Sequence, residues 1–292
     1  MSIKYDQTYI TVRQRTMLET FDIALQVGKE HFVQLALALL VGCAPWMLLN
    51  YVILYRWQSD DYQGLFFILM ASLVIAQAPL ATVIITDLMG AIMFRQKQRL
   101  LKSIMNCLRQ FGKLFWLHGI LRMAIPVTIL IAIMLPDWGI EGIVSYVMFV
   151  VFGSVGTGLL VRASRPFVTE VLLLEKPDWK PPRFGEVCFA NRSQSLHGPA
   201  FGTVFSQAIL VALFGFLLFL SFHGLFSLRQ FVTGNMDLDF WMFPIFFQLA
   251  CWCVAGFMTI VRFLFYIDLR IRQEGWEVEL KMRAEAKNFS DR

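Results

Sequence analysis

The fold of this chain is decided by residues 86–135, which read TDLMGAIMFRQKQRLLKSIMNCLRQFGKLFWLHGILRMAIPVTILIAIML. The stretch begins at the end of an apolar segment that carries one acid, Asp87, and then crosses a basic run without Asp or Glu. Between positions 100 and 115 apolar residues recur at helical spacing, with the basic residues largely on the opposite face. From Leu114 the chain is largely apolar again. The pattern predicts a membrane span, an amphipathic helix in the membrane interface and a second span.

The composition favours a membrane protein. Hydrophobic residues make up 57% of the 292 residues and charged residues only 16%, whereas soluble domains carry roughly 25% charged residues. The net charge of +5 does not indicate nucleic-acid binding, because the basic residues lie mostly between apolar segments. The five cysteines fit neither a disulfide framework nor a metal-binding spacing. The polar N-terminus predicts no cleavable signal peptide.

Six apolar segments are long enough to cross a hydrocarbon core about 30 Å thick. Their approximate bounds are 32–55, 65–94, 114–135, 140–163, 201–225 and 240–267, followed by a charged tail, 268–292. Of the 26 Lys and Arg, only Arg56 and Arg229 lie in the loops after odd-numbered spans. Because positive residues stay in the cytoplasm, both termini are expected there. The predicted fold class is all-α: one polytopic integral membrane domain, 1–292, with six transmembrane helices and amphipathic cytoplasmic interfacial helices.

The order of the segments predicts three helical-hairpin repeats of about 85 residues. Spans 1, 3 and 5 begin near positions 32, 114 and 201, and each follows an amphipathic segment that we call an elbow. Each even-numbered span ends near one acid; these acids are Asp87, Glu170 and Asp268. Acids at membrane depth usually have a partner, so we hypothesise that each pairs with a basic residue of an elbow or of the tail. The alternative is that they lie among water and lipid headgroups and need no partner.

The candidate charges inside the predicted spans are few. His118 and Arg122 lie four residues apart on one face of span 3, where Arg122 looks the deepest charge in the chain. An ionisable residue in a membrane is a functional candidate, although Arg122 could also extend to the headgroups, bind lipid phosphate or pair with Asp87. Arg270 and Arg272, directly after span 6, complete the set of candidate structural or functional charges.

Motifs for catalysis are missing from the sequence. It contains no metalloprotease, paired-cysteine, nucleophile-elbow or phosphate-loop motif, and no cofactor or metal is expected. The glycines of residues 153–158 look like a dinucleotide loop, but they lie inside span 4, where small residues favour helix packing. Prolines interrupt spans 1, 2, 3 and 6, as broken helices do in some transporters, yet few polar residues lie near the predicted midplane.

Two motifs resemble a bacterial family. Residues 19–25, ETFDIAL, are similar to the N-terminal helix of six-span proteins known as the membrane domain of glycerophosphoryl diester phosphodiesterase, and residues 265–275, FYIDLRIRQEG, are similar to their last motif. The resemblance implies six helices in a bacterial inner membrane. The phosphodiesterase activity belongs to family members fused to a separate soluble catalytic barrel, which nothing in this chain matches. The middle elbow departs from the pattern because it has no acid.

These observations predict a non-catalytic inner-membrane protein. We expect a scaffold, anchor or accessory subunit that binds a membrane or cytoplasmic protein through its elbows and C-terminal tail. The basic elbows would also attract anionic lipid headgroups, by about 1 kcal/mol per Lys or Arg. The alternative is a transporter or lipid-handling protein that uses Arg122 and His118 between its repeats. An enzyme is the weakest candidate.

Overall fold

The structure is a computed structural model that describes residues 16–54, 63–93, 100–125, 143–177, 179, 188–233 and 239–275. These residues are helical apart from short turns, which confirms the all-α class for the described part of the chain. The elements are α1 (Met17–Glu30), α2 (Phe32–Leu54), α3 (Gln63–Ala81), α4 (Val83–Met93), α5 (Leu100–Phe115), the π-helix η4 (Trp116–Ala124), α7 (Ile143–Ser164), α8 (Val168–Glu170), the π-helix η5 (Val171–Glu175), α9 (Phe189–His197), α10 (Phe201–Thr233) and α11 (Asp239–Glu274).

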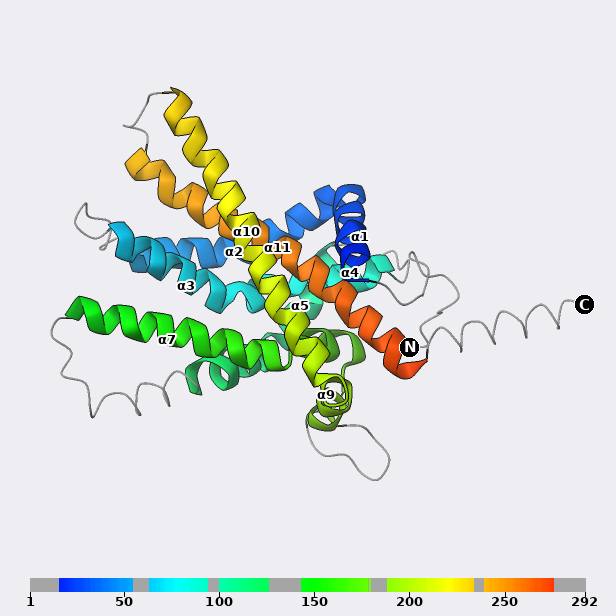
Figure 1. Ribbon diagram of the computed structural model, residues 1–292. Coiled ribbons are helices and arrows are strands. Elements are labelled where there is room, and N and C mark those ends of the chain that lie inside the picture. Colours follow the sequence, from blue (N-terminus) through cyan, green and yellow to red (C-terminus); the bar gives the residue numbers. More distant parts are fainter. Residues whose placement is uncertain are drawn as a thin grey trace, which may run out of the picture.

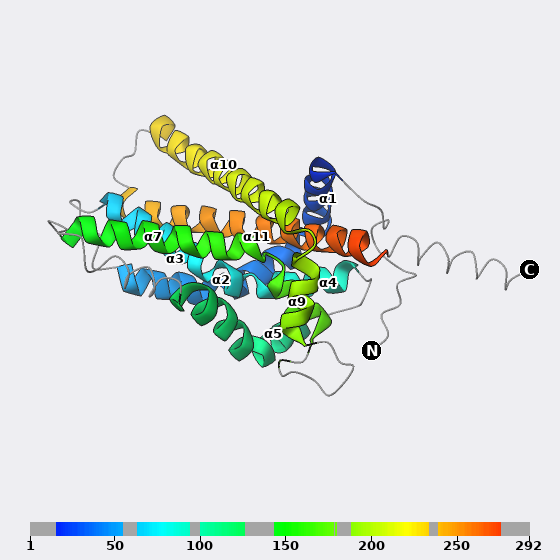
Figure 2. The same cartoon turned by 60° about the horizontal axis from the view of Figure 1, so that its bottom comes forward.

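The long helices run lengthwise through the molecule, and the short ones gather at one end (Figures 1 and 2). Helices α2 and α10 lead away from this end, whereas α3–α4, α7 and α11 return to it (Figure 1). Helices α1, α5 and α9 lie at the end where α11 finishes, which we call the short-helix end (Figure 2). Segments that are far apart in the sequence, from α1 to the end of α11, therefore lie at the same end of the molecule.

Helix α11 is the central element of the bundle. It packs against α1, α2, α3, α4, α9 and α10, and its Trp252, Phe263 and Tyr266 side chains are completely buried. In the most apolar part of α11, 67% of the residues are buried, whereas in the most apolar part of α10 only 6% are buried. Because α10 is strongly apolar yet exposed, lipid is the environment that suits it.

Three described helices are long and apolar enough to cross a membrane: Phe32–Leu54, Phe201–Leu225 and Ile245–Glu274. A fourth is added if Phe66–Ala81 and Val83–Met93, which meet at a 40° bend, form one span. The prediction of a membrane protein with several spans agrees with this finding. The predicted spans 3 and 4 fall partly on residues 126–142, which lie outside the described residues.

The bend in predicted span 2 follows Pro79. Proline has no N–H, so the carbonyl of Ile75 loses its helical partner, and α3 ends two residues later at Ala81. Here the helix backbones approach closely: a Cβ added to Gly42 of α2 would lie 2.0 Å from the carbonyl oxygen of Ala81. Gly42 is therefore required for this contact between α2 and the bend.

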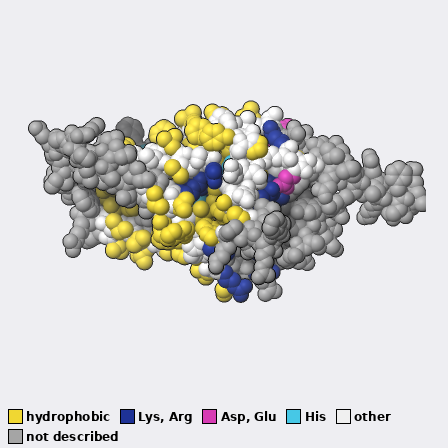
Figure 3. All heavy atoms as spheres, turned by 90° about the horizontal axis from the view of Figure 1, so that it is seen from below, with side chains coloured by type: hydrophobic (Ala, Val, Ile, Leu, Met, Phe, Trp, Pro, Cys, Tyr) yellow, Lys and Arg dark blue, Asp and Glu magenta, His cyan; other side chains and the backbone are white. Residues whose placement is uncertain are grey.

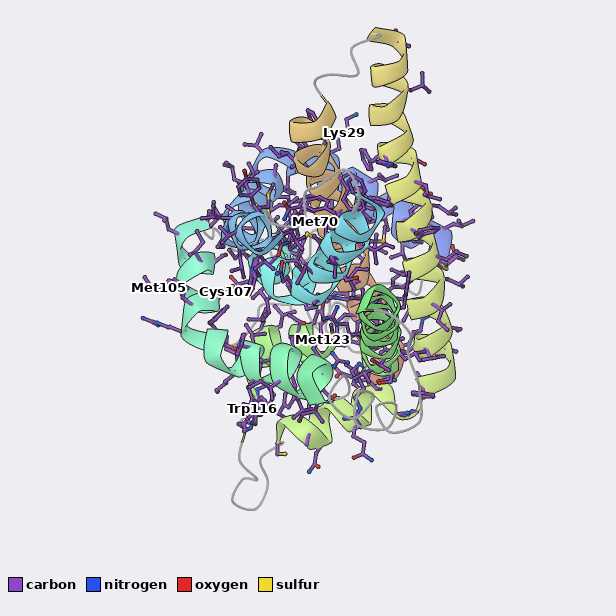
Figure 4. All side chains as sticks on the ribbon, turned by 90° about the vertical axis from the view of Figure 1, so that its left-hand side faces the viewer. Lys29, Met70, Met105, Cys107, Trp116 and Met123 are labelled. Carbon is purple, nitrogen blue, oxygen red and sulfur yellow. The ribbon has the colours of Figure 1, made fainter. Side chains whose placement is uncertain are left out.

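Two predicted segments can be compared with the described helices. Helix α7 ends at Ser164, close to the predicted end of span 4 at position 163, and the chain turns before α8. Helix α5, predicted to be amphipathic and to lie in the membrane interface, has its apolar Leu101 and Met105 exposed, while Cys107 is buried. Figure 4 shows Met105 pointing away from the bundle and Cys107 pointing into it.

Candidate functional site: a buried arginine cluster

Four arginines from three elements and the turn after α7 lie close together; one is buried, two are partly buried and one is exposed. Arg122 comes from η4, Arg162 from α7, Arg165 from the turn and Arg262 from α11. The last three lie close enough to Arg122 to repel its charge electrostatically. With His118 and Glu170 they form what we call the arginine cluster. Only His118, Arg122 and Glu170 of this set were candidates from the sequence.

Arg122 holds the end of α7. Its side chain is buried, and its Nη2 donates to the carbonyl oxygens of Val161 at 3.0 Å and Arg165 at 2.6 Å. The last carbonyls of a helix have no partner within the helix and carry its negative dipole end. A guanidinium is therefore well suited to this position. Met123, the next residue, lies beside α7 in Figure 4, and a Cβ added to Gly158 would lie 2.6 Å from its sulfur.

Arg162 binds the carbonyl that Pro79 leaves without a helical partner, together with the next carbonyl in the chain. Its Nη1 donates to the oxygen of Ile75, and its Nη2 donates to the oxygen of Ala76 at 2.8 Å. The first of these is the carbonyl whose helical partner would be the absent N–H of Pro79. The arginine thus contacts the middle of the bent pair α3–α4, a contact that the sequence did not predict.

Glu170 is the acid of this cluster. Its Oε1 accepts from Arg262 Nε at 2.7 Å, and its side chain is fully buried. The hypothesis of an elbow or tail partner was wrong for this acid, because its partner lies within predicted span 6. The neighbouring Thr169 Oγ1 is joined to His118 Nε2 by a buried hydrogen bond of 2.9 Å.

The cluster is short of partners and of negative charge. Four buried polar atoms have no hydrogen-bond partner among the described residues: His118 Nδ1, Arg162 Nε, Glu170 Oε2 and Arg262 Nη2. Four arginines face one glutamate, which leaves three net positive charges when all are ionised. Carbonyl oxygens satisfy hydrogen bonds but do not neutralise charge. Buried polar atoms are normally paired, so the site is suited to an anion.

The cluster opens towards an apolar surface. Arg165 is exposed, and the exposed side chains near it in the chain are the apolar Leu159 and Leu160, at 41% and 58%. Figure 3 shows Lys and Arg side chains in the middle of one face, bordered by hydrophobic side chains. Charged groups thus reach the surface within an apolar surround.

A second group of charges lies at the short-helix end, and we call it the Arg192 cluster. Arg192 of α9 pairs with Glu175 of η5 and with Glu274 of α11. Arg270 contacts the same two acids, at 3.5 Å and 2.5 Å, and Tyr266 donates to Glu175 at 2.6 Å. The pKa of Arg192 is raised, chiefly because its guanidinium donates to Glu175. The positive charges of the two arginines and the negative charges of the two glutamates therefore cancel in this cluster.

His197 lies between the two clusters. Its Nδ1 donates to the Ser193 carbonyl at 2.7 Å, and its Nε2 accepts from the Phe167 N–H at 3.3 Å. A carbonyl only accepts and an N–H only donates, so the imidazole is neutral with its proton on Nδ1. Burial, together with the charges of Arg122 and Arg165, lowers the pKa of His197 to about 4.

The remaining predicted charges lie outside the arginine cluster. Asp268 pairs with Arg272 of its own helix at 2.8 Å. Asp87 is buried in α4. The burial of Cys107, together with the negative charge of Asp87, raises the pKa of the Cys107 thiol to about 12. No group of three metal-ligating side chains occurs within the described ranges.

Comparison with known proteins adds no assignment: no family model, no curated protein and no solved structure matches this chain.

Proposed function

We propose that this chain is a six-span protein of the bacterial cytoplasmic membrane, with both termini inside, that handles an anionic lipid or solute at the arginine cluster. The observation that supports this function is the excess of positive charge around the buried Arg122. A charge within the bilayer is costly unless it has a partner or a function. The end of α7 explains the hydrogen bonds of Arg122, and the bend at Pro79 explains those of Arg162, but neither explains why three net charges are gathered at one place.

The test is movement across a bilayer. The full chain is reconstituted into liposomes, and uptake of radiolabelled inorganic phosphate and transbilayer movement of fluorescent phosphatidylglycerol are followed separately. We expect one of the two to exceed the rate in empty liposomes and to be lost in Arg122→Ala. Arg109→Ala, which removes an exposed arginine of α5, is the matched control and should keep the activity. Rates equal to those of empty liposomes for both probes would contradict the proposal.

A scaffold or anchor is the second candidate, and the exposed stripe of α5 favours it. Leu101, Met105 and Leu108 are exposed by 77%, 54% and 62%, beside the basic Lys102 and Arg109. Such a face suits the surface of an anionic membrane or a protein bound there. Purification from native membranes, followed by mass spectrometry, tests this function. A stoichiometric partner that is lost when residues 273–292 are deleted would support it.

The topology and the family are part of the proposal. The order of elements supports the first and third hairpins, since α1 precedes the longer α2 and α3–α4, and α9 precedes the longer α10 and α11. The resemblance to the six-span phosphodiesterase-associated membrane family supports the bacterial location without implying an enzyme. Labelling single cysteines placed at Ser59, Asp137 and Asn235 tests the topology. We expect all three to react from outside the cell, and protection of any one would change the number of spans.

A further inference from the structure

We infer that the arginine cluster binds a phosphate group, carried by a lipid headgroup or as free phosphate. This inference rests on the proposed function and names the class of its ligand. The argument has three parts: the donors that remain available, the charge that must be balanced and the surface from which a ligand would enter.

The available donors come from two helices. The pair between Glu170 and Arg262 uses one nitrogen and one oxygen, at 2.7 Å, rather than two parallel hydrogen bonds. Arg262 Nη2 is therefore left without a partner among the described residues, and so is Arg162 Nε. Arginine presents its N–H groups in a planar fork that matches the oxygens of a phosphate. One remaining donor nitrogen from each of these two helices can contact the same tetrahedral anion.

The charge favours phosphate over a carboxylate. The cluster has three net positive charges when its four arginines and Glu170 are ionised. A carboxylate or a phosphodiester adds one negative charge, whereas a phosphate monoester adds about two at neutral pH. The monoester neutralises most of the excess, so it is expected to bind most tightly. His118, which is 2% exposed and whose Nδ1 has no partner within the described ranges, adds a polar contact on the η4 side.

The surroundings suit a lipid. Leu159 and Leu160 of α7, together with Leu121 of η4, are exposed by 41%, 58% and 47%. Because they adjoin Arg122 and Arg162 in the chain, they provide an apolar surface for acyl chains near the charges. A headgroup could reach the exposed Arg165 first and then the buried arginines. The lipid is thus the source that the surface favours, and free phosphate is the second arm of the test.

The test measures binding to the full chain in a non-ionic detergent after lipid removal. Melting temperature is recorded against dioleoyl phosphatidic acid, dioleoylglycerol and inorganic phosphate. Phosphatidic acid near saturation should raise it by about 5 °C, and dioleoylglycerol, which has the same tails without the phosphate, should not. If inorganic phosphate alone gives the same rise, the ligand is free phosphate; if only the lipid does, it is a headgroup.

Variants show whether the cluster is the site. Arg262→Gln and Arg165→Gln should each weaken the apparent affinity about tenfold, a typical effect of losing one charged hydrogen bond. Arg165 is exposed, so its variant is expected to fold even if the Arg262 variant does not. Lys176→Gln, which removes an exposed cation directly after η5, is the control and should bind normally.

Three results would overturn the inference: equal stabilisation by dioleoylglycerol, no stabilisation by either phosphate probe, or unchanged affinity in both cluster variants. Binding without movement of either probe in liposomes would instead contradict the proposed function and leave this site assignment in place.

Discussion

The arginine cluster and the Arg192 cluster use the same side chain in opposite ways. In the Arg192 cluster, two arginines contact two glutamates, and Tyr266 donates to one of them. In the arginine cluster, four arginines share one glutamate, and most of their observed hydrogen bonds go to neutral carbonyls. The first arrangement joins η5, α9 and α11 within the protein. The second leaves charge that something outside the described chain must balance.

Removing the single acid of the arginine cluster should have the largest effect. Glu170→Gln would leave Arg262 without its ion pair and raise the excess charge of the cluster. We expect the free energy of unfolding to fall by about 4 kcal/mol, since breaking a buried ion pair on one side is strongly destabilising. Melting of the detergent-purified protein measures this, with Glu30→Gln on the exposed end of α1 as the control. Equal melting temperatures for the two variants would contradict the importance of the pair.

Lowering the pH should destabilise the protein through protonation of His197, which lies between the two clusters. The native pKa of His197 is lowered to about 4 from 6.5, so the unfolded chain takes up the proton first. This contribution to stability is complete above about pH 6.5 and is lost as the pH falls towards 4, by up to about 3 kcal/mol. Melting between pH 7.5 and 4.5 checks it. In His197→Gln, which keeps an acceptor but does not titrate, this part of the pH dependence should disappear; an unchanged profile would show that other groups cause it.

Removing an arginine should have different results in the two clusters. Arg192→Gln leaves Glu175 and Glu274 with Arg270 alone, and because these side chains are partly exposed we expect a loss of about 2 kcal/mol. Arg165→Gln removes one of the excess charges from the other cluster and should be neutral or slightly stabilising without ligand. Both are measured by melting in the same detergent. A larger loss for Arg165→Gln than for Arg192→Gln would reverse the comparison.

The sequence predicts two members of the arginine cluster well and their assembly with the others poorly. Helical spacing places His118 and Arg122 on one face, and both are indeed buried in η4. Arg162 and Arg262, in contrast, lie about 40 and 140 positions further along the chain than Arg122, and periodicity indicates the face of a helix but not its neighbour. The partner of Glu170 was sought in the wrong segment because the break after Ser164, which turns α8 towards α11, has no strong sequence signal.

The helices themselves were more predictable than their ends. The expected spans beginning at 32 and 201 match the first residues of α2 and α10, since long apolar runs determine where a membrane helix can form. The π-helical segment η4 was not predicted, because a change from i→i+4 to i→i+5 hydrogen bonding alters no composition. The exposed stripe of α5 was identified as amphipathic, but whether its apolar side meets protein or lipid depends on the packing of the whole bundle.

The smallest effect that we predict tests why Arg162 lies where it does. If it holds the Ile75 carbonyl because Pro79 cannot, Pro79→Ala should supply an N–H and remove part of the need for the arginine. Arg162→Gln should therefore cost about 1 kcal/mol less in the Pro79→Ala background than in the natural chain, a coupling measured by a double-mutant cycle of melting curves. The same cycle with Pro45→Ala in α2 should show additive effects. The carbonyls that Arg162 contacts in the described structure belong to α3 and not to α2. Additivity for Pro79 as well would mean that Arg162 is held by the charge of the cluster rather than by the bend, and the two clusters would then differ in charge alone.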